Sequence, residues 1–371
     1  MSAGLYIGVL SGTSVDGVDA VLARFAPRLE VLASHTLPYP ESLRAELLAL
    51  AIPGQDGVDQ VGAADVQVAH CFAQAVRELL VKAGVTAADV RAIGSHGQTI
   101  RHRPGGVTPF TLQIGDPNRI AAETGVPVVA DFRRKDLALG GQGAPLVPAF
   151  HAALFRDAAQ DRFIVNVGGI ANITVLPADP RAPVRGFDTG PGNTLLDAWC
   201  RRHTGDSMDR DGRWAAGGKS VPALLAALLA DPYFSQPAPK STGPEYFSAQ
   251  WLQATLDRFP GLAAADVQAT LVELTARSIA QAVAPWRGAA GAALHLCGGG
   301  AHNPELRRTL TLALPGVPVD TTVALGVPVG LVEGLAFAWL ARQYELGLPG
   351  NLPTVTGASR LAVLGGYYPA A

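Results

Sequence analysis

The first hundred residues alternate short apolar runs with glycine-rich turns and amphipathic stretches. Residues 6–25, YIGVLSGTSVDGVDAVLARF, predict an apolar strand, a polar loop and a second apolar strand. Apolar positions at helical spacing follow in 41–50 and 66–84. The segment 90–99, VRAIGSHGQT, then predicts a short strand that ends in a glycine turn. The order is therefore hairpin, helices, strand and glycine loop.

The second half of the chain repeats this order. Residues 162–176, RFIVNVGGIANITVL, again predict two strands joined by a glycine turn. Helical patterns follow in 194–205, 220–230 and 267–286, and 293–306 reads as a strand that feeds a triple-glycine loop. The two halves share almost no sequence identity, so the repeat is one of topology. It predicts an α/β protein made of two similar lobes that face a cleft.

The expected boundary between the lobes lies in 131–145, DFRRKDLALGGQGAP. We expect a first lobe of 1–131 and a second lobe of 132–344, with 345–371 packing back on the first. A chain of 371 residues is longer than one hydrophobic core usually serves, which agrees with two lobes. The glycines in 140–143 are a plausible hinge.

Composition excludes several classes of function. The net charge of −2 argues against nucleic acid as the main partner, because a phosphate backbone demands a basic surface. No apolar run approaches the ~20 residues that span a bilayer. The N-terminus lacks the basic region of a signal peptide, and Cys71, Cys200 and Cys297 are scattered without a pairing motif. These features predict a cytoplasmic protein with reduced thiols.

Two apparent motifs are rejected. The stretch GRWAAGGKS resembles a nucleotide-binding P-loop, but the glycine required six residues before Lys219 is replaced by Arg213, and the preceding residues are polar. The stretch 207–218 resembles a calcium loop, but Gly218 stands where the bidentate glutamate belongs. We read both as ordinary turns.

Four glycine-rich loops at predicted strand ends carry the candidate chemistry. Backbone N–H groups in such loops, and the helix N-termini that follow them, suit phosphate binding. Acids within the loops suit Mg²⁺ or a general base, so the combination predicts phosphoryl transfer without a P-loop. The loops are 11–19, 166–172, 187–193 and 297–305, and the acids in them are Asp16, Asp19 and Asp188.

As an ordered set, the motifs along nearly the whole chain resemble those of the anhydro-N-acetylmuramic acid kinase family. The motifs are GTSVDGVDA (12–20), GSHGQT (94–99), LQIGDPNRIA (112–121), VADFRRKDLALGGQGAPLVPAFH (129–151), NVGGIANIT (166–174), GFDTGPGN (186–193), CGGGAHN (297–303) and VEGLAFAWLA (332–341). The resemblance implies a two-lobed, actin-like α/β kinase fold of the duplicated ribonuclease H-like type with a central cleft. It implies an enzyme of peptidoglycan recycling that uses ATP and Mg²⁺. Such an enzyme opens 1,6-anhydro-N-acetylmuramic acid with water and phosphorylates O6, and we expect a homodimer.

The resemblance also implies roles for individual residues. Asp188 is the expected general base. The residues expected to bind ATP are Gly12, Thr13, Ser14, Val15, Asp16, Gly17, Val18, Asp19, Gly168, Gly169, Asn172, Gly298, Gly299, Gly300 and Asn303. Those expected to bind the sugar or its lactyl carboxylate are His96, Gln98, Asp116, Asn118, Arg119 and Arg134.

Three points stay open at this stage. The sequence does not decide whether Arg133 or Arg134 faces the sugar. Glu333, which opens an apolar helix, is either a catalytic residue or a helix-terminus acid. Related phosphate loops usually begin with an aspartate, and Leu10 occupies that position here. The metal ligand must therefore come from elsewhere, and the candidate loop acids named above are the choices.

Three rival functions remain. A different actin-like sugar or acid kinase would share the glycine loops but lack the joint SHGQT and GGQGAPL motifs. An ATP-gated scaffold without catalytic activity would have no need of a polar sugar pocket. A glycosidase that ignores ATP would need a second catalytic acid.

Overall fold

The computed structural model describes residues 4–12, 14–55, 57–288 and 291–370. Its internal packing divides the chain into two compact units: unit 1 is Met1–Phe150 with Leu331–Ala371, and unit 2 is His151–Gly330. This division differs from the expected one, because the helices in 132–138 and 332–345 pack on strands of unit 1. The glycines 140–143, expected as a hinge, lie inside unit 1, and the chain passes between units after Phe150 and Gly330.

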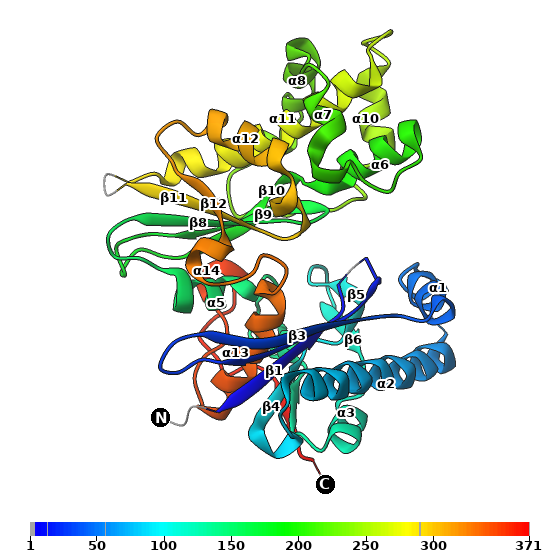
Figure 1. Cartoon of the computed structure of the whole chain (residues 1–371), viewed down its shortest axis with the longest axis vertical. Coiled ribbons are helices and arrows are strands. Elements are labelled where there is room, and N and C mark those ends of the chain that lie inside the picture. Colours follow the sequence, from blue (N-terminus) through cyan, green and yellow to red (C-terminus); the bar gives the residue numbers. More distant parts are fainter. Residues whose placement is uncertain (1–3, 13, 56, 289–290, 371) are drawn as a thin grey trace. The chain divides into compact units, whose positions relative to one another are not determined.

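Unit 1 is built on a six-stranded sheet in the order β13-β7-β4-β1-β2-β3. Figure 1 labels β4, β1 and β3 of this sheet. Strands β1, β2 and β3 form an antiparallel meander, β4 runs parallel to β1, and β7 parallel to β4. The strand bounds are β1 (Leu5–Leu10), β2 (Gly17–Arg24), β3 (Glu30–Pro38), β4 (Val90–Ser95), β7 (Val128–Ala130) and β13 (Gly366–Tyr368), with a separate hairpin of β5 (Gln98–Arg103) and β6 (Phe110–Ile114). The helices are α1 (Glu41–Leu50), α2 (Val58–Ala83), η1 (Ala87–Asp89), α3 (Pro117–Thr124), α4 (Phe132–Ala138), α13 (Val332–Glu345) and α14 (Pro353–Thr356), and α5 (Val147–Phe155) spans the boundary between the units.

Helix α13 lies directly on the middle of this sheet. Gly8 of β1 and Gly94 of β4 are neighbours in register, and a Cβ on either would collide with the α13 backbone, at Gly334 and Phe337 respectively. Only glycine allows a helix to approach a sheet this closely. The contact fixes the first turns of α13, which carry Glu333 and Phe337, against the ends of β1 and β4.

A buried carboxylate ties the C-terminal segment to unit 1. Asp136 is fully buried, and its Oδ1 accepts hydrogen bonds from Asn351 Nδ2 at 2.9 Å and Thr356 Oγ1 at 2.8 Å. Its Oδ2 accepts from the Gly143 amide at 2.8 Å. A buried charge is tolerated only when its lone pairs are satisfied in this way. The loop at 140–143 is therefore held in place by the last turns of the chain.

Unit 2 repeats the strand order of unit 1. Its five-stranded sheet has the order β10-β9-β8-β11-β12, with an antiparallel β8–β9–β10 meander and β11 parallel to β8 and to β12. The strand bounds are β8 (Asp161–Val167), β9 (Ile170–Leu176), β10 (Arg185–Pro191), β11 (Ala292–Cys297) and β12 (Val319–Thr321). The α/β class and the repeated topology are confirmed.

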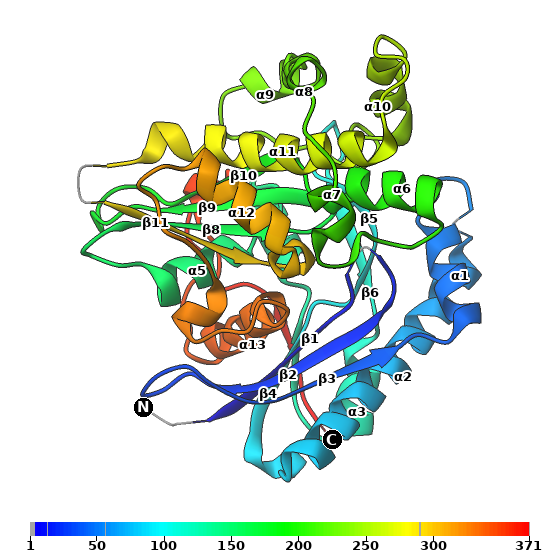
Figure 2. The same ribbon diagram turned by 45° about the horizontal axis from the view of Figure 1, so that its top comes forward.

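Helices cover the sheet of unit 2, and α11 runs along it with the shorter helices beyond (Figure 2). Buried side chains of α11, such as Leu271 and Ile279, join strand residues such as Phe163 and Val165 in one core. The helices are α6 (Asn193–Thr204), η2 (Arg210–Gly212), α7 (Arg213–Ala216), α8 (Pro222–Leu229), α9 (Pro232–Ser235), α10 (Ala249–Leu256), α11 (Ala264–Val283), η3 (Ala284–Trp286), η4 (Gly299–His302), α12 (Pro304–Ala313) and η5 (Thr322–Leu325).

All three cysteines are buried and carry no disulfide. Within the described ranges, no helix combines the length and apolar character that a membrane span requires.

Candidate functional site

The β1–β2 connection of unit 1 is the expected phosphate loop. Ser14 and Asp16 are exposed, whereas Val15 is buried and has a φ of 55°, a conformation that β-branched residues rarely adopt. A Cβ on Gly12 would meet only Ser14 Oγ, at 3.9 Å, so space is open beside this backbone. Thr13 lies outside the described residues. The loop therefore presents backbone and hydroxyl groups on its outer side.

The remaining members of this loop have structural roles in the sheet. Val18 is fully buried, and Gly17 packs so closely on β3 that a Cβ would collide with the Leu37 carbonyl. Asp19 is exposed and accepts a hydrogen bond from Thr36 Oγ1 at 2.6 Å. Asp16 lies 3.6 Å from the guanidinium of Arg44. Two carboxylates, Asp16 and Asp19, thus remain accessible in unit 1.

Buried polar atoms collect beside the phosphate loop. Gln98 is 2% exposed and donates from Nε2 to the Gly12 carbonyl at 3.3 Å. Gln98 Oε1, Ser11 Oγ and Ser95 Oγ are buried without a hydrogen-bond partner in the described part of the chain. Such atoms usually find water or a ligand. They lie at or just after the carboxyl ends of β1 and β4, where α/β proteins commonly bind ligands.

His96 and Arg133 form a half-buried pair in unit 1. Arg133 donates from Nε to His96 Nε2 at 3.0 Å and from Nη1 to the Gly143 carbonyl at 2.8 Å. Because Nε2 accepts, the proton sits on Nδ1, which lies 2.9 Å from the Gly97 carbonyl. Burial and the neighbouring guanidinium hold the pKa of His96 well below its usual value, so the ring is neutral. Burial lowers the pKa of Arg133 to about 10, against the attraction of Glu333.

This geometry separates the two arginines that the sequence left undecided. Arg133 lies inside unit 1 beside His96, whereas Arg134 has a side chain 63% exposed and lies 3.3 Å from Asp131. Glu333 is exposed in the first turn of α13 and interacts with Arg133, so it is both a helix-terminus acid and a neighbour of the His96–Arg133 pair.

The expected sugar-binding residues Asp116, Asn118 and Arg119 form the first turn of α3. Asp116 is the N-cap, and its Oδ1 accepts from the Asn118 amide at 2.9 Å. Arg119 is exposed and lies 3.6 Å from Asp116. The turn follows Ile114, whose carbonyl packs against Gly97, so it lies in the same region as His96 and Gln98.

In unit 2, polar residues form a row across three strands. Asn166 of β8 is opposite Asn172 of β9, which is opposite Asp188 of β10. Directly opposed residues point to the same face of an antiparallel sheet, and their Cβ atoms lie about 5 Å apart. All three are half-buried. The structure therefore brings together Asp188 and Asn172, which the sequence placed at separate sites.

The glycine loops of unit 2 pack closely at the end of this row. The carbonyls of Gly168 and Gly169 accept from the amides that open α6, at 2.8–3.1 Å. A Cβ on Gly298 would collide with Asn166 and one on Gly300 with Val167, whereas Gly299 is exposed with only ordinary contacts. Two of the three glycines thus serve protein packing, and Gly299 alone presents open backbone.

Asn303, expected on the adenosine side, caps a helix. Its Oδ1 accepts from the amides of Glu305 and Leu306 at 3.0 and 3.1 Å, and Pro304 takes the first position of α12, where its missing N–H costs no hydrogen bond.

Asp188 is held by three hydrogen bonds. Its amide donates to the Lys240 carbonyl at 3.0 Å, its carbonyl accepts from Tyr233 Oη at 2.8 Å, and its Oδ2 accepts from the Thr242 amide at 3.0 Å. Burial raises the pKa of the Asp188 carboxyl to about 6, and the Thr242 bond opposes this rise. A carboxylate with such a pKa can accept a proton near neutral pH.

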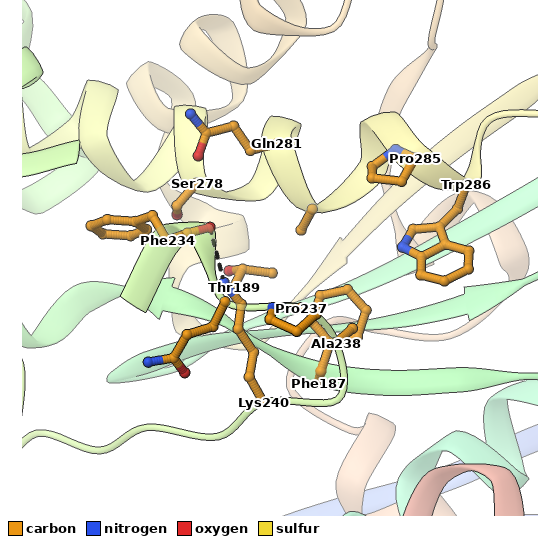
Figure 3. A pocket seen from close by; sticks show the side chains of 12 residues that line it. Phe187, Thr189, Phe234, Pro237, Ala238, Lys240, Ser278, Gln281, Pro285 and Trp286 are labelled. Atoms are coloured by element: carbon orange, nitrogen blue, oxygen red, sulfur yellow. Dashed lines mark hydrogen bonds between the residues drawn. The ribbon is translucent and has the colours of Figure 1, made fainter. Parts of the chain in front are cut away.

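The neighbours of Asp188 in β10 line a pocket of about 180 Å³ within unit 2 (Figure 3). Phe187 and Thr189 line this pocket with Phe234 and Lys240. Successive side chains of a strand point to opposite faces, so Asp188 is directed away from the pocket. Motif reasoning missed Tyr233, Lys240 and Thr242, because none of them belongs to a glycine motif, and Lys240 and Thr242 contact Asp188 through backbone groups.

The rejected P-loop has the geometry of an ordinary turn. Lys219 is exposed after the short helix α7, and its amide donates to Asp266 at 2.7 Å. The described residues contain no cluster of three or more His, Cys, Asp or Glu side chains that could form a metal cage.

Comparison with known proteins gives the family. A family model described as "Anhydro-N-acetylmuramic acid kinase" matches residues 4–370. Proteins of that name from Shewanella oneidensis and Shewanella amazonensis are 53% and 54% identical to this chain, and each alignment covers 100% of both sequences. A solved ROK family glucokinase from Streptomyces griseus, in complex with glucose and AMPPNP, aligns over 92% of this chain and 100% of its own, with 15% identity and a TM-score of 0.41. The chain belongs to the anhydro-N-acetylmuramic acid kinase family.

Proposed function

We propose that this protein is an ATP-dependent kinase that opens 1,6-anhydro-N-acetylmuramic acid and phosphorylates O6, in the recycling of peptidoglycan. The observation that carries the proposal is the match to full-length relatives of that name, together with the half-buried Asp188 carboxylate, whose pKa suits a general base. In this reaction water attacks C1 of the sugar, the C1–O6 bond breaks, and O6 takes the γ-phosphoryl group, with ADP leaving. Cytoplasmic location and a homodimer remain expectations.

Asp188 is assigned as the base that takes a proton from the attacking water. The leaving O6 normally needs a general acid in glycoside hydrolysis, but capture by the phosphoryl group replaces that proton. One ionised carboxylate is then sufficient. Its raised pKa supports this role, since a base with a pKa near the working pH transfers protons efficiently.

The ATP phosphates are assigned to the exposed residues Gly12, Ser14 and Asp16 of the β1–β2 connection in unit 1. Among the glycines of unit 2 that are expected to bind ATP, Gly299 is exposed and has only ordinary contacts. Mg²⁺ bound to a nucleotide needs only one or two protein carboxylates, and it helps to neutralise charge on the phosphates. Asp16 and Asp19 are accessible donors of the right type to hold it. For the lactyl carboxylate we prefer Arg133 over Arg134, because the Arg133 side chain is half-buried and bonded to His96, whereas that of Arg134 is 63% exposed.

The test is product identification by mass spectrometry after incubation with ATP, Mg²⁺ and a panel of anhydro and reducing amino sugars. We expect ADP and an anhydro sugar that has gained one water and one phosphoryl group. In water labelled with ¹⁸O, the label should enter the sugar at C1 and not the phosphate.

Each rival function predicts a different product. Hydrolysed sugar without phosphate indicates a glycosidase. Phosphorylation of reducing sugars alone indicates a different sugar kinase. ADP formation without any sugar product indicates an ATP-gated scaffold. Any of these results would refute the proposal.

A further inference from the structure

Asp188 lies in an edge strand, and a segment outside the sheet satisfies that edge. Strand β10 ends the order β10-β9-β8-β11-β12, so its outer N–H and C=O groups have no strand partner. At Asp188 both groups are nevertheless bonded: the N–H donates to the Lys240 carbonyl, and the C=O accepts from Tyr233 Oη. Buried backbone groups need such partners.

The same segment also contacts the carboxylate. The Thr242 amide donates to Asp188 Oδ2, so one short stretch of chain, Lys240–Thr242, holds both the backbone and the side chain of this residue. The register of β10 shifts directly after Asp188, between it and Gly190. A bulge of this kind re-aims the adjacent side chain and makes external support of the strand more important.

The segment is itself tied to helix α9. Lys240 Nζ donates to the carbonyls of Tyr233 and Phe234 at 2.9 and 3.3 Å, and lies 4.4 Å from the centre of the Tyr233 ring. Figure 3 shows Lys240 and Phe234 side by side, with the second of these bonds dashed. Tyr233, whose hydroxyl bonds to Asp188, is therefore connected to the segment Lys240–Thr242, whose backbone also bonds to Asp188.

We propose that Tyr233, Lys240 and Thr242 act together as positioning residues for Asp188, holding its carboxylate in the orientation needed to accept a proton. This inference rests on the proposed function, because it concerns the base of that reaction. None of the three is assigned a contact with substrate; they act through Asp188 alone.

Among the described groups around Asp188, the Thr242 amide is the one that stabilises its ionised carboxylate. Tyr233 faces it from α9, and the pKa of this phenol is raised by burial and by the Asp188 charge. The Lys240 ammonium donates to backbone carbonyls and is not paired with the Asp188 carboxylate. On α11, the charges of Glu273 and Arg277 pair with each other at 3.2 Å. Asn172 opposite is neutral. Among the described residues, the bond that stabilises the charged carboxylate is that from Thr242.

The deciding comparison is Thr242→Pro against Thr242→Ala. Both lose the threonine side chain, but only proline removes the amide donor. Loss of a hydrogen bond to the charged form should raise the pKa of Asp188 by about one unit. The acidic limb of the kcat profile then moves by about one unit to higher pH, because the base must be ionised. At pH 8 the carboxyl is mostly ionised in both variants, but it is no longer oriented in the proline variant. We therefore expect kcat about tenfold lower there, with the KM values for ATP and sugar unchanged.

Identical pH limbs and kcat values in the two variants would overturn the inference. If Thr242→Pro does not fold, Tyr233→Phe replaces it: loss of the hydroxyl should lower kcat about threefold or more at unchanged KM. A Tyr233→Phe enzyme with wild-type kcat, or with a raised KM and unchanged kcat, would equally contradict positioning.

A second measurement separates this inference from the proposed function. The ¹³C resonance of the Asp188 carboxyl, assigned by its loss in Asp188→Asn, reports the pKa without any reaction. A wild-type protein that makes no phosphorylated sugar refutes the proposed function. A carboxyl pKa that does not differ between Thr242→Ala and Thr242→Pro refutes the inference even if the kinase is active.

Discussion

The two units share a strand order but hold their acids differently. In unit 1, Asp16 and Asp19 are exposed on the connection from β1 and on β2, and their carboxylates contact the Arg44 guanidinium and the Thr36 hydroxyl respectively. In unit 2, the β8–β9 connection consists of Gly168 and Gly169 alone. The acid of this unit, Asp188, lies in the edge strand β10 and takes part in three hydrogen bonds. Exposed acids suit a hydrated metal, whereas a buried and oriented acid suits proton transfer.

The largest expected effect comes from removing the buried acid. Asp188→Asn keeps the shape and loses the proton acceptor, so turnover should fall about 10²–10⁴-fold, the usual range for a general base. The KM values for ATP and sugar should stay near those of the wild type, since the lost interaction belongs to the transition state. Steady-state kinetics on both substrates measures this.

The matched variant is Asp16→Asn in unit 1, which should raise the Mg²⁺ or ATP requirement instead. An Asp188→Asn enzyme that keeps most of its turnover would move the base elsewhere, with Glu333 the first candidate. If Asp188→Asn stays folded but no longer binds ATP, Asp188 acts chiefly on the metal and the contrast between the units is wrong.

A second experiment tests the open backbone of unit 1. In Gly12→Val the new side chain has room in the protein, so folding should be intact, but it would occupy the space assigned to phosphate. We expect kcat/KM for ATP to fall about tenfold or more. Gly105→Val is the control, because Gly105 is also exposed and has open space around it. Equal ATP kinetics in the two variants would show that the β1–β2 connection does not bind the ATP phosphates.

Replacing Asp188 should increase the stability of the protein at pH 8, although it lowers the activity. Its pKa rises on folding from 3.8 to about 6, so the favourable protonated state is lost as pH increases through this window. The ionised acid therefore costs folding free energy at pH 8, by about 1–2 kcal/mol after allowance for its partial exposure. Asp188→Asn should raise the melting temperature of unit 2 at pH 8 and lose most of that advantage at pH 4. A difference that is the same at both pH values would contradict the burial of this charge.

The smallest expected effect is at Lys219. It is exposed, no strand leads into its turn, and it lies in the only stretch that resembles a P-loop by sequence. Lys219→Ala should leave the KM for ATP within about twofold of the wild type. A large loss of ATP affinity in the folded variant would reverse the assignment of phosphate binding to the β1–β2 connection.

The sequence was most informative where a motif coincides with an element end. Glycine turns between apolar runs predict the first hairpin of each meander, and Asp188 was found because it stands next to Thr189-Gly-Pro-Gly. Arg133 and Arg134 show the limit: adjacent residues of a helix point in different directions, and only packing decides which is buried. The unit boundary also needed packing information, because α13 belongs to unit 1 through glycines at positions 8 and 94.

Thr242 marks a second limit of sequence reasoning. Its contribution is a backbone amide, which every residue except proline possesses, so no residue type signals it. Gly298 and Gly299 look alike in the chain, yet one faces Asn166 and the other is open. Which glycine serves packing depends on a neighbour that lies far away in sequence.

The close approach of α13 to Gly8 and Gly94 has a consequence for biosynthesis. The N-terminal part of a chain leaves the ribosome first, and domains generally fold as units while synthesis continues. Strands β1 and β4 emerge early, but the helix that covers them begins at Val332, after the whole of unit 2. Unit 2 is therefore the first that can fold completely, and one apolar face of the N-terminal sheet stays uncovered until α13 has been synthesised.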